Sequence, residues 1–375
     1  MDFSYSEQQK SILDLASQIL RDGTSQVRLR EIEATAGPRF DRALWEKLAE
    51  AGLLAVAIPE QFDGAGLGFV EVGVIIQQIG RTAAPVPFLE SVVLGALPLA
   101  EFGSEAQKQT WLPRLASGEA ILTAGLTEPE GDPKHPVTAA IPNGDGYRLS
   151  GSKICVPAAE LADALLVPAA TPEGRVVIAL LDARAEGLTV TPLDTTSGQP
   201  ESRVELVDVA IDTGALLGSA DNGAEILDWM LQRANAALAN LALGVCEEAL
   251  ELTAEYAKTR KQFDQPIAMF QAVGHRAADA YIDVEGIRLT TLQATWRIAA
   301  GRPAAKQIAV AKHFACEAGQ RVVHAAQHLH GGIGVDTEYP LHRTFLYMKQ
   351  LELTLGGSTP QLLALGNLIA EEETA

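Results

Sequence analysis

The sequence has few cysteines and no long uninterrupted apolar run. Only three of its 375 residues are cysteine, and they are widely separated, without the CxxC spacing that is typical of metal sites and redox motifs. We therefore predict that Cys155, Cys246 and Cys316 are reduced and mostly buried as small hydrophobic side chains. Because no run of about 18 apolar residues occurs, the sequence predicts no transmembrane helix and no membrane partner.

Basic residues are also scarce. The chain has 29 lysines and arginines against 48 aspartates and glutamates, which gives a formal net charge of −19. Nucleic-acid binding requires a basic footprint, so we predict no nucleic-acid partner, and any anionic ligand needs a local basic or amide-rich pocket. The polar start from Met1 to Glu7 lacks the basic and apolar regions of a secretory signal, so we expect a cytoplasmic protein.

The first third of the chain has the apolar spacing of helices. The sequence from Ser6 to Gln9 is typical of a capped helix start. A second amphipathic run extends from Arg42 to Ala51, and the glycine-rich stretch from Ile58 to Gly68 predicts a loop before the apolar run at Val70–Ile79. We therefore predict an N-terminal α-helical domain over residues 1–122.

The pattern changes near residue 123 to short β-branched runs separated by glycine, proline and aspartate. The sequence Asn143-Gly144-Asp145-Gly146 is a strong hairpin-turn signal. Strands are predicted at five places: Tyr147–Ser150, Ala164–Val167, Val176–Leu181, Leu188–Val190 and Ser202–Val207. Together they predict a middle β domain over residues 123–222.

Residues 223–375 return to helical spacing and are rich in alanine and leucine. Helices are predicted over 224–257, 268–299 and 302–328, with more beyond Leu341 and breaks at Pro340 and Gly356. Small residues dominate the first of these helices and permit close helix packing in a bundle. The fold class is therefore α+β, in the order helical domain, β domain, helical bundle.

Two motifs in the last domain have both a structural and a functional interpretation. Arg260-Lys261-Gln262-Phe263 closes a helix, where its charge either complements the helix dipole or binds a diphosphate, with Phe263 against a ring. In His328-Leu329-His330-Gly331-Gly332-Ile333-Gly334, the glycines either stop a helix or bring backbone amides to a phosphate. No carboxylate stands near these histidines at a usual ligand spacing, so we expect no metal site.

These motifs resemble, in their order, the acyl-CoA dehydrogenase family. Further matches are Phe270-Gln271, Thr337-Glu338-Tyr339-Pro340, Pro59 to Gly64 and Leu126 to Pro129, so the resemblance covers nearly the whole chain. It implies an N-terminal helical domain, a β-barrel-like middle domain and a C-terminal four-helix bundle. It also implies FAD as cofactor, an acyl-CoA substrate and an electron-transfer flavoprotein as electron acceptor.

In this family a carboxylate takes the α-proton of the acyl thioester while the β-hydrogen passes to the flavin as hydride. The adenine and diphosphate of FAD reach into the neighbouring subunit. The resemblance thus implies cofactor-binding roles for Arg260, Gln262, Phe263, Gln271, Gln327, His328, His330, Gly331, Gly332 and Gly334, and for Thr127 in the β domain. One departure from the family pattern is His328, which stands where a glutamine is usual, with Gln327 displaced by one position.

The catalytic residues of the family do not recur. Gly356 and Ala234 occupy the two positions at which the base usually stands, and neither side chain takes a proton. Glu225, Asp228 and Glu352 lie nearby in sequence, so a relocated base stays open as an alternative. In the β domain, Cys155 replaces the tryptophan and Pro157 the hydroxyl residue that flank the flavin ring, which removes stacking and a hydrogen bond. The Gly-Ser-Asp segment that usually follows Thr-Glu-Pro is also missing, since Glu130 to Lys134 stands there.

A chain with this combination resembles the non-catalytic subunit of actinobacterial α2β2 acyl-CoA dehydrogenases that degrade steroid side chains. The leading hypothesis is that it completes the FAD site of a paralogous catalytic subunit. One alternative is a homotetrameric dehydrogenase with a relocated carboxylate. Another is a catalytically inactive scaffold or ligand-binding module. The small residues at the start of the C-terminal bundle leave room for a bulky acyl group, but they equally suit simple helix packing.

Overall fold

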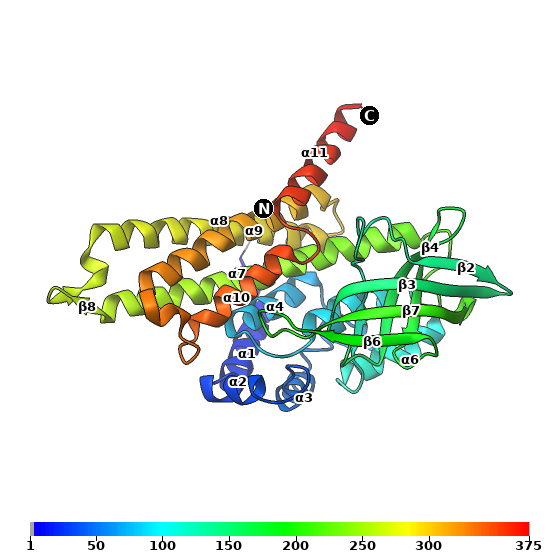
Figure 1. The fold of residues 1–375 in the computed structure, drawn as a ribbon, viewed down its shortest axis with the longest axis horizontal. Helices are drawn as coiled ribbons and strands as arrows, with labels where there is room; N and C mark the ends of the chain where they lie inside the picture. The colour runs from blue at the N-terminus through cyan, green and yellow to red at the C-terminus, as the bar shows by residue number, and fades with distance from the viewer. Residues whose placement is uncertain (1–3, 375) are drawn as a thin grey trace. The chain divides into compact units, whose positions relative to one another are not determined.

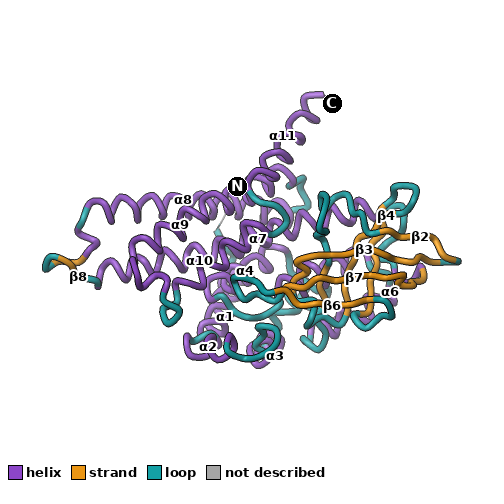
Figure 2. Tube along the Cα trace, in the orientation of Figure 1, coloured by secondary structure: helices purple, strands orange, loops and turns teal. Residues whose placement is uncertain are grey.

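A computed structural model describes residues 4–374 and divides into two compact units (Figures 1 and 2). The helical unit combines the chain up to Arg30 with Phe69–Ala84 and Asn235–Ala375. The mixed unit combines Glu31–Gly68 with Pro85–Ala234. The start at Met1 to Phe3, on which the prediction of a cytoplasmic protein partly rests, lies outside the described residues. The division into segments 1–122, 123–222 and 223–375 follows sequence texture and stays a prediction.

The N-terminal third is helical, as predicted. Ser6 accepts a hydrogen bond from the backbone of Gln9, whose side chain returns one, so the predicted capping box is confirmed. The elements are α1 (Glu7–Gly23), α2 (Gln26–Glu33), α3 (Arg42–Glu50), η1 (Glu60–Phe62), α4 (Phe69–Thr82), η2 (Leu89–Ala96), α5 (Leu97–Phe102) and α6 (Glu105–Ala116). Among them, η2 is a π-helix, a form that the sequence does not signal.

One mixed seven-stranded sheet forms the core of the mixed unit. Its strands are β1 (Leu122–Ala124), β2 (Ala139–Asn143), β3 (Gly146–Pro157), β4 (Ala164–Ala170), β5 (Val176–Asp182), β6 (Leu188–Leu193) and β7 (Glu201–Asp212). The order is β1-β4-β2-β3-β7-β6, with β5 beside β4. All five predicted strands are present, and Asn143 pairs with Gly146 across the predicted hairpin turn. A short helical turn, η3 (Thr213–Ala215), follows the sheet.

Strand β3 is irregular where it passes Cys155. Its pairing with β7 shifts register between Lys153 and Val156, and Cys155 has a positive φ of 51°. A bulge of this kind re-aims a side chain, and Cys155 is exposed while Cys246 and Cys316 are buried. The three thiols are free, as predicted, but the only one of them at the irregular position is not buried.

Long helices make up the C-terminal part. They are α7 (Gly223–Thr259), α8 (Gln271–Ala299), α9 (Ala305–His330), α10 (Leu341–Leu353) and α11 (Ser358–Thr374), and α7 runs from the mixed unit into the helical unit. Within the helical unit, α4 crosses α7 at very short range. A Cβ added to Gly80 would lie 2.2 Å from the Leu241 carbonyl oxygen, and one added to Gly244 would lie 1.9 Å from that of Gln77. Small residues therefore permit the close helix approach that the sequence predicts.

The end of α7 differs from the prediction. The helix stops at Thr259, and Lys261–Gln262 (β8) pairs with Gln265–Pro266 (β9) in a small hairpin, followed by η4 (Ile267–Met269). The helix was expected to include Arg260 to Phe263, and helical spacing alone does not reveal this turn. No helix among residues 4–374 combines the length and apolarity that are required to cross a bilayer.

Candidate functional site

The hairpin after α7 presents an aromatic side chain on a strained turn. Phe263 and Asp264, the two residues between β8 and β9, have φ angles of 52° and 62°, as a two-residue hairpin loop of type I′ requires. The left-handed conformation is rare for a bulky residue and marks a local constraint. Phe263 is 88% exposed and touches only the edge of Phe270, with ring centroids 6.2 Å apart. The turn thus holds an aromatic ring out toward solvent.

Arg260 lies at the base of this hairpin. Its carbonyl oxygen accepts a hydrogen bond from Ile267 N (2.9 Å), which fixes the backbone. The residue is exposed, and none of the described carboxylates forms an ion pair with its guanidinium. Gln262 is also exposed, and its amide donates to the Lys261 carbonyl (2.8 Å). The hairpin therefore offers a planar cation and an aromatic ring on the same short segment.

An aromatic stack joins the end of α7 to the end of α9. Tyr256, one turn before Arg260, stacks on His330 with ring centroids 4.4 Å apart and planes 22° apart. His330 Nδ1 lies 2.8 Å from the Ala326 carbonyl oxygen and Nε2 lies 3.0 Å from the Tyr339 hydroxyl. Burial lowers the pKa of His330, so the neutral ring donates from Nδ1 and accepts at Nε2. The structure thus brings the two sequence motifs together.

The glycine segment after His330 forms an open turn. Gly331 has a φ of 65° and ends α9, while Gly331–Val335 forms the short helix η5, so the glycine-stop interpretation is correct for Gly331. A Cβ added to Gly331 or Gly332 would meet nothing within 4 Å. Gly334 is buried, and its carbonyl accepts from the Gln327 amide (3.4 Å). The backbone at 331 and 332 is therefore accessible to a ligand.

The predicted binding residues fall into two groups by exposure. The side chains or backbone that reach solvent belong to Arg260, Gln262, Phe263, Gln271, His328, Gly331 and Gly332. His330, Gly334 and Gln327 instead hold the turn from within. A guanidinium, free amides and an exposed ring suit a diphosphate with an attached ring system, presented outward from this chain. Thr127 belongs to the mixed unit, where its carbonyl oxygen accepts from Ile154 N (2.9 Å).

Neither usual base position could hold a glutamate without rearrangement. Ala234 is completely buried, so a longer acidic side chain has no space there. Gly356 has a φ of 91°, a conformation that is strained for any residue with a Cβ. Among the sequence alternatives, Asp228 is paired with Lys134 (2.7 Å) and Glu352 with Lys349 (2.5 Å). Glu225 is solvated on the surface of α7.

One carboxyl group with unusual chemistry was missed by the sequence analysis. Burial, and to a smaller extent the charge of Glu201, raise the pKa of Glu90 to about 7. Glu201 also accepts a hydrogen bond from the Cys155 thiol, and partial burial of the sulfur together with this carboxylate raises the pKa of Cys155 to about 11. No motif marks Glu90, because its π-helix and the start of β7 meet only in the folded unit.

Arg233 was also missed. Its guanidinium lies 3.5 Å above the Trp229 ring centroid, donates to the Trp229 carbonyl (3.3 Å), and pairs with none of the described carboxylates within 4 Å. Burial lowers its pKa to about 10, against a smaller opposing effect of Glu101. A half-buried cation without an acidic partner is unfavourable and suits an anionic ligand. Its neighbour Ala234 drew attention in the sequence, but Arg233 itself follows no spacing rule.

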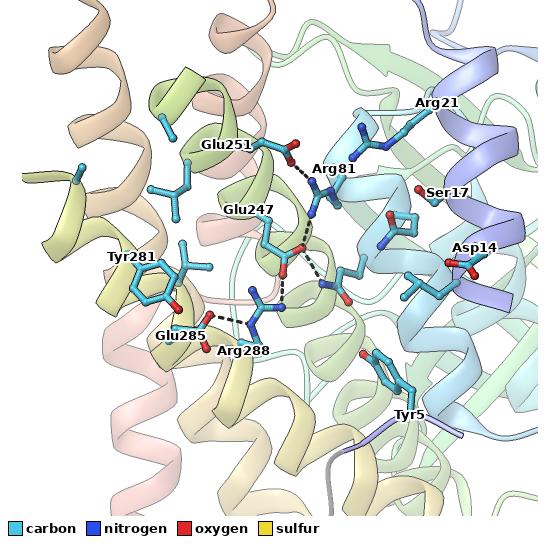
Figure 3. A pocket seen from close by; sticks show the side chains of 17 residues that line it. Tyr5, Asp14, Ser17, Arg21, Arg81, Glu247, Glu251, Tyr281, Glu285 and Arg288 are labelled. Atoms are coloured by element: carbon cyan, nitrogen blue, oxygen red, sulfur yellow. Dashed lines mark hydrogen bonds and ion pairs between the residues drawn. The ribbon is translucent and has the colours of Figure 1, made fainter. Parts of the chain in front are cut away.

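A cavity of about 680 Å³ lies between α1, α4, α7 and α8 in the helical unit (Figure 3). Glu247 occupies its floor and accepts from Gln77 (2.8 Å), Arg81 (3.3 Å) and Arg288 (2.6 Å). Because this buried carboxylate is paired on both oxygens, the cluster joins three helices and carries no free acid for proton transfer. Among residues 4–374, no group of three or more histidine, cysteine or acidic side chains is arranged to hold a metal ion.

Two family models match the sequence. One, described as the acyl-CoA dehydrogenase N-terminal domain, matches residues 6–119, and the other, the acyl-CoA dehydrogenase C-terminal domain, matches residues 221–367. The acyl-CoA dehydrogenase FadE27 of Mycobacterium tuberculosis is 42% identical over 379 residues, covering 99% of each chain. These matches span both helical regions and the β domain between them.

Solved structures agree with this assignment. A chain of the ChsE4-ChsE5 complex from Mycobacterium tuberculosis is 42% identical with a TM-score of 0.94, covering 99% of both chains. A chain of the Tcur3481-Tcur3483 steroid dehydrogenase is 42% identical with a TM-score of 0.92, covering 98% of this chain and 99% of the other. The FAD complex of PigA is 26% identical with a TM-score of 0.90 over 99% of both chains. The helical and sheet regions follow the same fold, and the chain belongs to the acyl-CoA dehydrogenase family.

Proposed function

We propose that this chain is the base-lacking subunit of an α2β2 acyl-CoA dehydrogenase, in which it completes the FAD site of a paralogous catalytic subunit. The observation that carries the proposal is the contrast between two sites on one chain. The diphosphate-binding end is intact and faces outward at Arg260, Phe263 and Gly331. The two base positions hold a buried alanine and a left-handed glycine.

When bound, FAD supplies the hydride acceptor for dehydrogenation of the acyl thioester. The residues of this chain hold the cofactor and take no part in proton transfer. Arg260 binds the diphosphate through its guanidinium fork, and the amides at Gly331 and Gly332 add hydrogen bonds to the same anion. Phe263 and Gln262 contact the adenosine part, while Gln271 and His328 border it. The neutral His330 keeps these two segments in register through its stack on Tyr256.

The partner and the substrate class follow from the similar proteins. Two of the solved structures are complexes of two different chains, and one of them is described as a steroid dehydrogenase. We therefore propose a paralogous subunit as partner, a bulky acyl-CoA such as one with a steroid side chain as substrate, and an electron-transfer flavoprotein as acceptor. Arg233, half-buried on Trp229 without an acidic partner, is suited to a phosphate of the CoA moiety.

The decisive experiment compares the chain alone with the chain co-expressed with its paralogous subunit. Alone it is expected to purify without flavin absorbance and without dehydrogenase activity. In the complex, Arg260→Met is expected to weaken FAD binding about 10- to 100-fold, as loss of a charge-assisted contact does. Arg148→Met, at an exposed ion pair with Asp208, is the matched control and leaves flavin content unchanged.

Two results would contradict the proposal. Full flavin occupancy with turnover by the chain alone would instead identify a homo-oligomeric dehydrogenase. Absence of flavin from every complex, together with an unaltered partner enzyme, would identify an inactive scaffold.

Glu90 favours one second candidate, a homotetrameric dehydrogenase with a relocated carboxylate. A pKa of about 7 matches what a general base requires near neutral pH, whereas Asp228 and Glu352 are held in ion pairs. Under this alternative, Glu90→Gln abolishes turnover of the chain alone while flavin stays bound. Under the leading proposal, the chain alone has no turnover to lose.

A further inference from the structure

The outer surface of α8 and α9 carries an exposed apolar strip. Ile282 and Leu289, two turns apart on α8, are 66% and 53% exposed, and Phe314 of α9 is 37% exposed. Gly286 lies between the two α8 residues, and a Cβ added there would stand 2.9 Å from the Phe314 ring. The missing side chain lets Phe314 lie across α8, so the strip extends over both helices. Exposed apolar residues that form one contiguous strip mark an interaction surface.

A hollow of about 640 Å³ borders this strip. Ile282 lines it together with Gln320 and Arg321 of α9. Both amide atoms of Gln320 are shielded from solvent and have no hydrogen-bond partner among the described residues. Buried side-chain polar atoms are nearly always paired in folded proteins, so this amide is placed for a group that enters the hollow. The α8–α9 face, meaning Ile282, Leu289, Phe314 and this hollow, is therefore an apolar surface with an unmet polar group beside it.

The charges around the α8–α9 face are of both signs. Asp283 accepts two hydrogen bonds from the Arg321 guanidinium, at 2.6 and 2.9 Å. Arg276, Asp279 and Glu317 form no ion pair within 4 Å among the described residues. The chain as a whole has a net charge of −19, so most of its surface repels a second copy. This face is nearly balanced and does not.

The dimensions of the face suit a stable interface. The 29 residues of α8 extend about 43 Å, since an α-helix rises about 1.5 Å per residue, and α9 has 26 residues. Two adjacent helices, each about 10 Å wide, present on the order of 800 Å². That is about the area that each partner contributes to an interface of standard size.

We infer that the α8–α9 face joins two copies of this chain about a two-fold axis. A two-fold interface sets the same patch against itself, so it requires apolar residues and charges of both signs within one patch. Arg276 of one copy then meets Asp279 or Glu317 of the other, and Ile282 or Phe314 packs against the hollow. The inference goes beyond the proposed function, which concerns the hairpin and the paralogous subunit, and it stands or falls without it.

The first test measures the mass of the full chain in solution by sedimentation equilibrium. The wild-type chain is expected at twice its chain mass of 39.8 kDa, and Ile282→Asp with Leu289→Asp at one chain mass. Val207→Asp is the matched control, because Val207 is 71% exposed on the β-sheet and lies outside the face. Arg276→Glu, a single surface change, is expected to weaken the dimer about tenfold by setting like charges against each other.

The same variants distinguish this contact from the contact with the paralogous subunit. In the co-expressed complex, the double variant is expected to yield flavin-containing heterodimers in place of heterotetramers. A monomeric wild-type chain at 100 µM, or a variant that stays dimeric, would overturn the inference. It would equally fail if the double variant lost the paralogous subunit, since the face would then belong to that contact. An unchanged melting temperature of the variant confirms that it folds.

Discussion

The carboxyl groups of Glu90 and Glu201 determine how the mixed unit responds to pH. Glu90 has a pKa of about 7 in the folded chain against 4.5 in its model state. The folded chain therefore binds more protons than the unfolded chain between these values. The stabilisation from protonated Glu90 is present below pH 4.5 and is lost as the pH rises through 7.

Replacement of Glu90 by glutamine removes this pH dependence. Glu90→Gln is expected to raise the melting temperature at pH 8, where the wild-type carboxylate is charged in its buried site, and to change it little at pH 5. Thermal unfolding from pH 5 to 8.5 measures the difference. Glu225→Gln, an exposed position on α7, is the control. An equal shift at every pH would show that Glu90 titrates normally.

At this scale the sequence predicts residues that act through local geometry. Arg260, Phe263 and Gly331 stand in contiguous motifs, and the structure places them in one exposed end of the helical unit. Glu90 and Arg233 do not belong to any motif. Their properties arise from partners and burial created by distant segments, as when Glu201 is set beside Glu90, and a single sequence contains no record of that distance.

At the scale of helices, Glu247 joins three elements of the helical unit. It accepts hydrogen bonds from α4 through Gln77 and Arg81, and from α8 through Arg288, and it is 6% exposed (Figure 3). Removing one member of a buried ionic cluster leaves the others charged and uncompensated. Glu247→Ala is therefore expected to lower the free energy of unfolding by about 3–5 kcal/mol, measured by urea denaturation.

The control for this prediction is an exposed pair on α1. Lys10 contacts Glu7 at 2.7 Å, with side chains 55% and 91% exposed, and such pairs contribute about 0–1 kcal/mol. Lys10→Ala is expected to leave stability almost unchanged. A loss below about 1 kcal/mol for Glu247→Ala would show that solvent already screens the cluster.

The crossing of α4 and α7 gives a second prediction for elements. Gly80→Ala is expected to destabilise the chain by about 1–3 kcal/mol, because its Cβ would stand 2.2 Å from the Leu241 carbonyl and force the helices apart. Gly274 in α8 has nothing within 4 Å of an added Cβ, so Gly274→Ala is expected to stabilise by about 0.5–1 kcal/mol. Opposite signs for two identical substitutions separate packing from helix propensity. Destabilisation by both would contradict this view.

Most elements could be predicted because their periodicity is local. The capped start at Ser6, the five strands and the breaks at Pro340 and Gly356 appear where the sequence places them. The hairpin after Thr259 and the π-helix at Leu89–Ala96 were not predicted. The hairpin turn uses Phe263 and Asp264 in place of the usual asparagine and glycine, so its sequence carries no turn signal.

At the scale of the whole molecule, the chain retains one end of a cofactor site and lacks the residues for the reaction. Substitutions at the base positions are compatible with the fold: Ala234 packs in the core and Gly356 adopts the turn before α11. The exposed hairpin and the α8–α9 face both direct binding groups outward. Function is therefore expected to depend on assembly, and the net charge determines under which conditions assembly is favoured.

A net charge of −19 predicts a salt dependence that differs from that of the buried clusters. Self-repulsion destabilises the compact state, and it is screened beyond about 10 Å at 0.1 M salt. Exposed ion pairs weaken at the same time, but each contributes at most about 1 kcal/mol. Raising NaCl from 20 to 500 mM is thus expected to raise the melting temperature by a few degrees, measured at pH 8. At pH 4.8, the calculated isoelectric point, the same salt change is expected to have no stabilising effect. A fall in melting temperature at pH 8 would show that surface ion pairs outweigh the repulsion.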